Sequence, residues 1–596
     1  MHLRIALLLS LCSATRLAAL DDITSAELTR VPAPGRVTAL VDEAERTSWG
    51  SQVAMLRRAA FAAYESGRGA AAAWYYLYRW ADLLGQPDGK AVRDWVDAVK
   101  TAKVGHANMA TRYQWGPGSA AAHLSRELQL HALGSAAFSE EFFTTLQPVD
   151  HPLRVLDILQ QLYTADSAHF ADYQNLALAI AVVFDVPPPP FWPHGQVSAS
   201  VLPREFPAPS DAFAYWIKLD RSGQSLHRFK RLSAVELKYV VDSPAPFVEL
   251  DWARSNVPWV LSDFAKAYDL IRYRKDRLVA NQSDWKKLDY RLATIRQEGG
   301  ICVDQAYFAY SAGKAKGIPT ILLRGAGLDG RHAWFGYLGG DGWVLDCGRY
   351  AEQKFVVGLA WDPQTWANVT DHELVFLSEH FHALPGYKFS QLHTAFAGEY
   401  LRTGDLAGAV RAAREAVNRE HRNLEAWRML LRVQTSAGVD ARMIEVTLHE
   451  AAIAFQRYPD IEAAFKRQIA QSLRARGELS AANHEEQRLT RKYSSDRTDL
   501  SIRQSTERME RSIREEDLAD QIRTFKHLLD TEGRGASIDF FDQVVAPFIN
   551  HLQGLGETPA ALQMLERARQ TLRVESGRQL EMEMNALATR LKTGKN

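Results

Sequence analysis

The chain has 596 residues, which at about 150 residues per domain is enough for three or four domains. Lysine and arginine together number 71, and so do aspartate and glutamate, so the formal net charge is zero. Because there is no basic surplus, we expect neither nucleic acid nor an anionic membrane surface as a partner. Proteins, peptides, glycans and small molecules remain as candidates.

The first twenty residues have the organisation of a secretory signal peptide. Arg4 precedes the apolar run Ile5–Leu11, and small residues follow it (Ser13, Ala14, Ala18 and Ala19). The run is too short to span a bilayer, which takes ~20 residues, and the alternative is a buried N-terminal helix. We expect residues 1–20 to be removed and the mature chain, which has no membrane span, to be exported to the periplasm or the extracellular medium.

Residues 21–186 are expected to form a helical N-terminal domain. Trp74, Leu77, Tyr78 and Ala81 lie at helical spacing, as on the buried face of a helix. Residues 187–262 are expected to be a Pro-rich linker followed by short strands, because four prolines open the segment and Tyr239–Val241 is a short apolar run. A structural linker is favoured over a Pro-rich recognition motif, since the flanking aromatic residues are more simply explained by burial.

Cysteine usage singles out one residue for chemistry. Of three cysteines, Cys12 lies in the removable segment, so the mature chain keeps Cys302 and Cys347. This number excludes a disulfide-built scaffold. A single thiol in an oxidising compartment is a liability unless it has a use, which favours a chemical role for Cys302.

Cys302 is expected at the start of a buried helix. Gly299 and Gly300 precede it, and Val303, Ala306, Tyr307 and Tyr310 follow at helical spacing, with a stop at Gly317-Ile318-Pro319. The unpaired N–H groups at a helix start favour thiolate over thiol and can bind an oxyanion. The two glycines are expected to let a substrate backbone come close.

Two candidate partners follow on predicted strands. After a strand at 320–324, a strand at 330–337 carries His332, a Gly-rich turn reverses the chain, and a strand at 343–346 carries Asp346. Adjacent antiparallel strands would place the two residues near one another, and the helix that begins at Cys302 is expected to pack on this sheet. Cys347 should face the opposite side of its strand from Asp346.

The order of these motifs resembles the transglutaminase-like superfamily over residues 270–350. The resemblance implies an α+β papain-like core, here bounded as residues 263–390, with Cys302 as nucleophile, His332 as base and Asp346 orienting the imidazole. It implies an acyl-thioester intermediate and protein or peptide amides as substrates. Hydrolysis is favoured over cross-linking because it needs only water, and no cofactor or metal is expected because the sequence has no recognisable calcium loop. Taken singly, the same residues would be an inert buried thiol, a core histidine and a turn cap.

Some roles stay open at the sequence level. Gln297 and Trp285 are both candidates for a second oxyanion donor, but neither is assigned to the site. Trp334 is expected to pack in the core more readily than on a substrate. A Cys302–Cys347 disulfide would inactivate the site.

Residues 391–596 are expected to form helical repeats. Gly404 and Gly556 are each followed by alanine at +5 and +12, Gly477 has Ala482 at +5, and Gly438 lies 34 residues after Gly404. Glycine suits a turn between helices, and alanine allows helices to approach closely, so such units stack and bury their faces on one another and not on the thiol domain. The pattern resembles the tetratricopeptide repeat, with His421 where that family has proline; ordinary antiparallel helices are the alternative.

The sequence therefore predicts a multidomain α+β protein with helical regions on both sides of a transglutaminase-like core. Its repeats offer a surface for a protein partner. The functional alternative to an enzyme is an exported scaffold in which the transglutaminase-like fold is catalytically inactive, because a fold alone does not assign an activity.

Overall fold

The computed structural model describes residues 23–67, 69–102, 117–202, 204–280, 285, 289–328, 330–350, 356–533, 538–572 and 574–593. The expected signal peptide, residues 1–20, lies outside the described residues. The chain divides into two compact units. The first contains residues 1–321, 337–340 and 361–368, and the second contains residues 322–336, 341–360 and 369–596.

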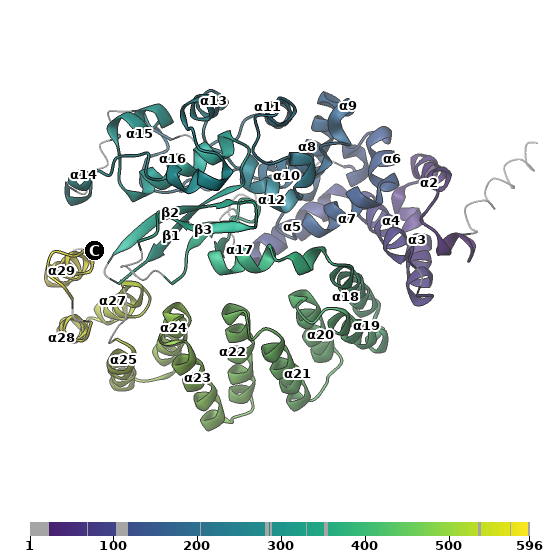
Figure 1. Ribbon diagram of the computed structural model, residues 1–596. Helices are drawn as coiled ribbons and strands as arrows, with labels where there is room; N and C mark the ends of the chain where they lie inside the picture. The colour runs from purple at the N-terminus through teal and green to yellow at the C-terminus, as the bar shows by residue number, and fades with distance from the viewer. Residues whose placement is uncertain are drawn as a thin grey trace, which may run out of the picture. The chain divides into compact units, whose positions relative to one another are not determined.

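The N-terminal part of the first unit is helical, as the sequence predicts (Figure 1). The side chains of Trp74, Leu77, Tyr78 and Ala81 are buried on one face of α4, which confirms the helical spacing. The helices are α2 (Pro34–Arg46), α3 (Trp49–Glu65), α4 (Ala71–Leu84), α5 (Asp88–Ala102), α6 (Arg126–Gly134), α7 (Ala136–Thr145), α8 (Pro152–Ala165), α9 (Ser167–Phe170) and α10 (Gln174–Phe184).

The segment expected to hold short strands is helical, so that expectation is wrong. It contains α11 (Pro209–Arg221), α12 (Ala234–Val241) and α13 (Phe247–Asn256). A capping box starts α12: the Glu236 N–H donates to Ser233 Oγ at 3.3 Å, and the Ser233 N–H donates to Glu236 Oε2 at 2.9 Å. The cap begins a helix before the apolar run Tyr239–Val241 is reached, so the run becomes its buried end.

The non-helical crossing at residues 187–190 is confirmed. Beyond it, the loop is organised around one buried guanidinium. Arg204 donates to the carbonyl oxygens of Trp192, His194 and Val197, at 2.6, 2.9 and 2.7 Å. A charged side chain that satisfies several loop carbonyls allows the flanking aromatic residues to be buried.

The helices that precede the sheet are η5 (Leu261–Ala267), α14 (Lys275–Ala280), α15 (Leu292–Glu298) and α16 (Cys302–Ala315). A buried ion pair fixes the C-terminal end of α16. Lys314 Nζ contacts the carboxylate of Asp242 and donates to the Thr320 carbonyl at 3.1 Å, while the Tyr310 hydroxyl donates to Asp242 Oδ2 at 2.8 Å. This network joins α16 to α12 and to the first residue of the next strand.

In the described part of the chain, five strands form one antiparallel sheet in the order β3-β2-β1-β4-β5. Most of its residues belong to the second unit. Arg324 of β1 pairs with Leu359 of β4. The first three strands are those predicted from the sequence. The strands are β1 (Thr320–Ala326), β2 (Arg331–Leu338), β3 (Trp343–Cys347), β4 (Leu359–Trp361) and β5 (Asn368–Thr370).

The C-terminal region is helical, as predicted, and each helix from α18 to α25 packs against the next (Figure 1). Gly404, Gly438, Gly477 and Gly556 all have a positive φ and lie between helices. The alanines at +5 and +12 are fully buried where the pattern is complete. The helices are α17 (Asp371–Leu377), α18 (Pro385–Thr403), α19 (Leu406–Arg419), α20 (Leu424–Ser436), α21 (Ala441–Ala454), α22 (Pro459–Ala475), α23 (Leu479–Tyr493), α24 (Thr498–Glu515), α25 (Leu518–Glu532), α26 (Ile538–Phe540), α27 (Ala546–Gly554), α28 (Thr558–Thr571) and α29 (Gln579–Thr593).

These helices also bury surface against the sheet, contrary to the expectation that they bury it only against one another. Ala326 of β1 packs against the apolar cluster of the last helices. The Ile538 N–H donates to the carbonyls of Gly327 and Leu328, at 3.3 and 3.2 Å. Residue 390, the expected boundary between thiol domain and repeats, lies inside α18, so a continuous helix joins the two.

Candidate functional site

Cys302 is the first residue of α16, as predicted, and its side chain is partly buried. The rest of the helix is buried from Val303 to Ala315. Asp304, in the first turn, accepts a hydrogen bond from the Ile301 N–H at 2.8 Å. One of the N–H groups at this helix start is therefore occupied by a carboxylate, which the sequence argument for an open helix terminus did not include.

The two glycines before Cys302 are needed for close packing. The Gly300 N–H donates to the Arg272 carbonyl at 3.0 Å, and the Arg274 N–H donates to the Gly300 carbonyl at 2.8 Å. Gly299 has φ +74°, and a Cβ there would lie 2.4 Å from the Arg272 oxygen. A Cβ at Gly300 would lie 2.3 Å from the Cβ of Asp304. The two glycines are therefore explained by packing, since a side chain at either position would clash, and not by the room that we expected them to give a substrate backbone.

His332 is a buried residue of β2 with a fixed ring. Its Nε2 lies 2.7 Å from the carbonyl oxygen of Gly348, and the ring stacks on Tyr350 with centroids 4.2 Å apart. A carbonyl only accepts hydrogen bonds, so Nε2 carries the proton. In the neutral ring, Nδ1 is then the basic nitrogen.

Asp346 lies on β3, the strand next to β2, as predicted, but its side chain is exposed. The acceptor on the imidazole Nε2 is the carbonyl of Gly348, two residues later, and not the carboxylate of Asp346. The neighbouring Cys347 is buried, which confirms that the two residues face opposite sides of the strand. Burial, together with the charge of Asp346, raises the pKa of the Cys347 thiol to about 12.

Neither Cys302 nor Cys347 is in a disulfide. Both residues are therefore thiols, and the Cys302–Cys347 disulfide considered from the sequence is not formed. Burial holds Cys347 in its thiol form.

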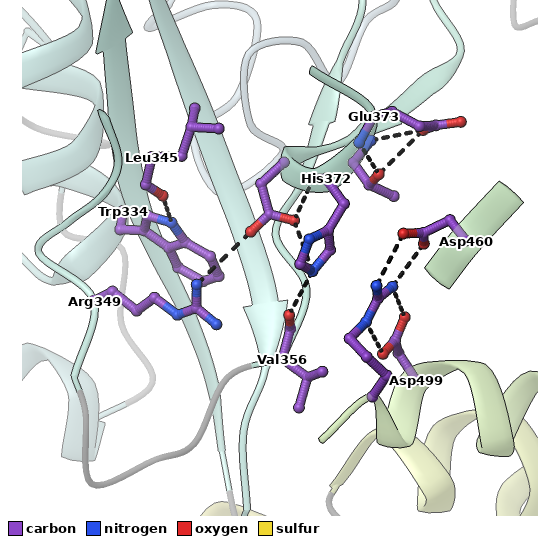
Figure 2. Close-up of polar contacts among 11 residues, drawn as sticks. Trp334, Leu345, Arg349, Val356, His372, Glu373, Asp460 and Asp499 are labelled. Carbon is purple, nitrogen blue, oxygen red and sulfur yellow. Dashed lines mark hydrogen bonds and ion pairs between the residues drawn. The ribbon is translucent and has the colours of Figure 1, made fainter. Parts of the chain in front are cut away.

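Trp334 packs in the core, as expected. It is fully buried, and its indole N–H donates to the Leu345 carbonyl at 2.8 Å (Figure 2). Arg349 lies over the indole, 5.5 Å from the ring centroid, and is 3.7 Å from Asp371. Burial raises the pKa of the Asp371 carboxyl. These contacts hold β2 and β3 in place beside His332.

The two candidates for a second oxyanion donor differ in their surroundings. Trp285 is buried, and its side chain is hydrogen-bonded to Asp304. Gln297 is exposed on α15. The indole N–H of Trp285 is thus committed to a carboxylate.

Sequence reasoning missed Asp304 and the residues that hold it. The signal was the acidic residue at the third position of the predicted helix, which is typical of a capping box. Its partners Tyr290 and His194 gave no such signal, since they lie 14 and 110 residues before it in the chain.

Cys302 lies in the first compact unit, and His332 and Asp346 lie in the second. No family model matches this chain, and no curated protein matches it. Among the described residues, no helix combines the length and the apolar character needed to cross a membrane.

Proposed function

We propose that the chain is an exported, cysteine-dependent amide hydrolase or acyltransferase that acts on protein or peptide amides, with Cys302 as nucleophile and His332 as base. The observation that carries this proposal is the orientation of His332, whose Nε2–H points to the Gly348 carbonyl. An imidazole held in this way presents Nδ1 as a base of defined direction. The partly buried thiol at the start of α16 supplies the nucleophile.

The reaction follows from these two groups. Nδ1 of His332 takes the proton of the Cys302 thiol, and the sulfur attacks the carbonyl carbon of the amide, whose oxygen takes up the electron pair. When the tetrahedral intermediate collapses, the C–N bond breaks, and the imidazolium gives its proton to the leaving amine. Water then releases the acyl group from the thioester as an acid, or an amine releases it as a new amide.

Asp346 has a smaller part in this proposal than the resemblance implies. The hydrogen bond from His332 supports the Gly348 carbonyl as the group that fixes the tautomer. An exposed carboxylate on the adjacent strand acts on the imidazole only through solvent-screened electrostatics. The proposed export of the protein rests on residues 1–20, which have the organisation of a signal peptide.

A non-catalytic scaffold is the second candidate. The apolar side chains of Met443, Val446 and Ile453 are exposed on α21, and exposed apolar side chains on a repeat helix suit a protein partner. The two candidates differ in whether the Cys302 thiol forms a thioester.

An electrophilic amide probe would separate the two candidates. The purified full chain is treated with the probe, and the modified residue is mapped by peptide mass spectrometry. We expect modification at Cys302, loss of modification in Cys302→Ala and in His332→Ala, and normal modification in Cys347→Ser. Modification that is equal in the native chain and in His332→Ala would support the scaffold.

A further inference from the structure

A buried chain of hydrogen bonds lies behind the first turn of α16. The Tyr290 hydroxyl donates to Asp304 Oδ1 at 2.6 Å, the Ile301 N–H donates to Asp304 Oδ2 at 2.8 Å, and Trp285 is hydrogen-bonded to the same carboxylate. Asp304 is 3% exposed. Burial raises the pKa of the Asp304 carboxyl, and the three donors that converge on it oppose that rise and favour the ionised form.

His194 completes the chain and sets its direction. Its Nε2 lies 3.2 Å from the Tyr290 hydroxyl oxygen, and burial lowers the pKa of His194 to about 3, so the ring is neutral. Because Tyr290 gives its proton to Asp304, its oxygen accepts the Nε2–H of His194. In the described part of the chain, His194 Nδ1 is buried with no hydrogen-bond partner, as suits a nitrogen that carries no proton.

The cations near this chain of hydrogen bonds only partly balance the charge of the Asp304 carboxylate. Arg277 attracts the Asp304 charge, but its Nη1 donates to the Gly299 carbonyl at 3.3 Å, and its guanidinium lies over the Trp285 ring at 4.6 Å. Arg204 acts electrostatically on Tyr290, and its own donors go to loop carbonyls. Other titratable groups among the described residues here are Glu249, on α13, the buried hydroxyl of Tyr307, which stacks on Tyr290, and the hydroxyl of Tyr268, which donates to the Cys302 carbonyl at 3.5 Å.

We propose that Asp304 is a positioning residue that holds a fixed negative charge at the start of α16 and so keeps the Cys302 sulfur as a thiol until an imidazolium is present. The proposal rests on the proposed function, because it assigns the resting state of that nucleophile. A helix N-terminus carries about half a positive charge, and a full carboxylate in the first turn outweighs it. The Cys302 thiolate then forms because His332 takes the proton, and not because of the helix N-terminus.

The alternative is that Asp304 is only a helix cap. The two roles predict different effects of Asp304→Asn on the formation of the Cys302 thiolate. If Asp304 acts through its charge, Asp304→Asn removes the negative charge and leaves an amide oxygen for the Ile301 N–H, so the thiolate becomes easier to form. If it acts only as a cap, the Asn amide either keeps or weakens that cap, and the thiolate does not become easier to form.

The test is the pH profile of Cys302 alkylation by iodoacetamide in the full chain, followed by peptide mapping. For Asp304→Asn we expect labelling at pH 6 to be about threefold to tenfold faster, with the midpoint of the profile moved to lower pH. Tyr290→Phe should shift the profile the same way by a smaller amount, since it removes one donor that keeps Asp304 ionised. Asp263→Asn, which removes an exposed carboxylate on η5, is the matched control and should change nothing.

Slower or unchanged labelling in Asp304→Asn, with circular dichroism as in the native chain, would overturn the proposal. The proposed function fails by a different outcome, namely a native Cys302 that the amide probe does not modify. The ratio of Asp304→Asn to native labelling is informative in either case, because iodoacetamide reports the thiolate without requiring turnover.

Discussion

The guanidinium of Arg331 and the carboxylate of Asp542 are joined by two parallel hydrogen bonds, from Nε to Oδ2 at 3.0 Å and from Nη2 to Oδ1 at 2.5 Å. The same guanidinium contacts Glu583 on α29, and the Arg331 N–H donates to Gln579 Oε1 at 3.0 Å. Asp542 lies in a π-helical turn, Phe541–Val545, before α27. The residue next to His332 is thus anchored to the last helices of the chain.

Arg331→Ala is therefore expected to loosen the attachment of α29 to the sheet. The side chains are partly exposed, so we expect a loss of about 1 kcal/mol in the free energy of unfolding, the upper end for such pairs, because the contact is a bidentate network. Hydrogen exchange of the full chain should show faster exchange in residues 579–593. Arg523→Ala, which removes an ion pair within α25, is the control; equal effects of the two variants would contradict the anchoring role.

Cys302 should be alkylated much faster than Cys347. Near neutral pH an ordinary thiol, with a pKa of ~8.5, is a few per cent thiolate, whereas burial raises the pKa of Cys347 to about 12. We expect at least a hundredfold difference in iodoacetamide labelling, measured by peptide mapping. His332→Ala should slow labelling of Cys302 and leave Cys347 unchanged. Equal, slow labelling of both cysteines would argue for the scaffold.

Asp346→Asn should change turnover by less than about threefold, because the His332 tautomer is held by a main-chain carbonyl. His332→Ala should abolish turnover. The measurement is the rate of amide cleavage with the probe substrate on both variants. A loss of a hundredfold or more in Asp346→Asn would restore the orienting role that the transglutaminase-like resemblance gives to Asp346.

The buried pair Lys314–Asp242 should be costly to break on one side. Both side chains are buried, so Lys314→Met leaves an unpaired carboxylate and is expected to cost about 3–5 kcal/mol of unfolding free energy. The double variant Asp242→Asn/Lys314→Met should lose less than that single variant, because no buried charge is left alone. Urea unfolding of the single and double variants gives a double-mutant cycle. Losses of unfolding free energy that simply add would contradict an energetic coupling between Lys314 and Asp242.

His123 should give a pH-dependent contribution to stability. A hydrogen bond from its Nδ1 to Asp157 Oδ1, at 2.6 Å, raises the pKa of His123 above its ordinary value of 6.5. A raised pKa means that the folded chain binds the proton more tightly, so this stabilisation is present below pH 6.5 and is lost as pH rises through the folded pKa. Asp157→Asn should lower the melting temperature at pH 5.5 and leave it nearly unchanged at pH 9. An equal loss at both values would mean that the bond acts without the charge.

Local sequence patterns are enough to place the helices and strands around the candidate site. They predict the start of α16 at Cys302, the strands that carry His332 and Asp346, and the glycine turns of the C-terminal helices. Helical spacing, turn residues and strand alternation each involve only a few neighbouring positions. The helix that ends at Tyr239–Val241 has a local cause too, since Ser233 and Glu236 form the capping box that starts it.

Which groups these helices and strands contact depends on the packing of the whole chain. The Gly348 carbonyl, and not Asp346, receives the His332 hydrogen bond because that choice depends on strand register, which the sequence pattern leaves open. Asp304 is held by a chain that ends at His194, and Arg331 by a carboxylate 211 residues away. Contacts between distant segments depend on how whole elements pack, and no short window of sequence contains that information.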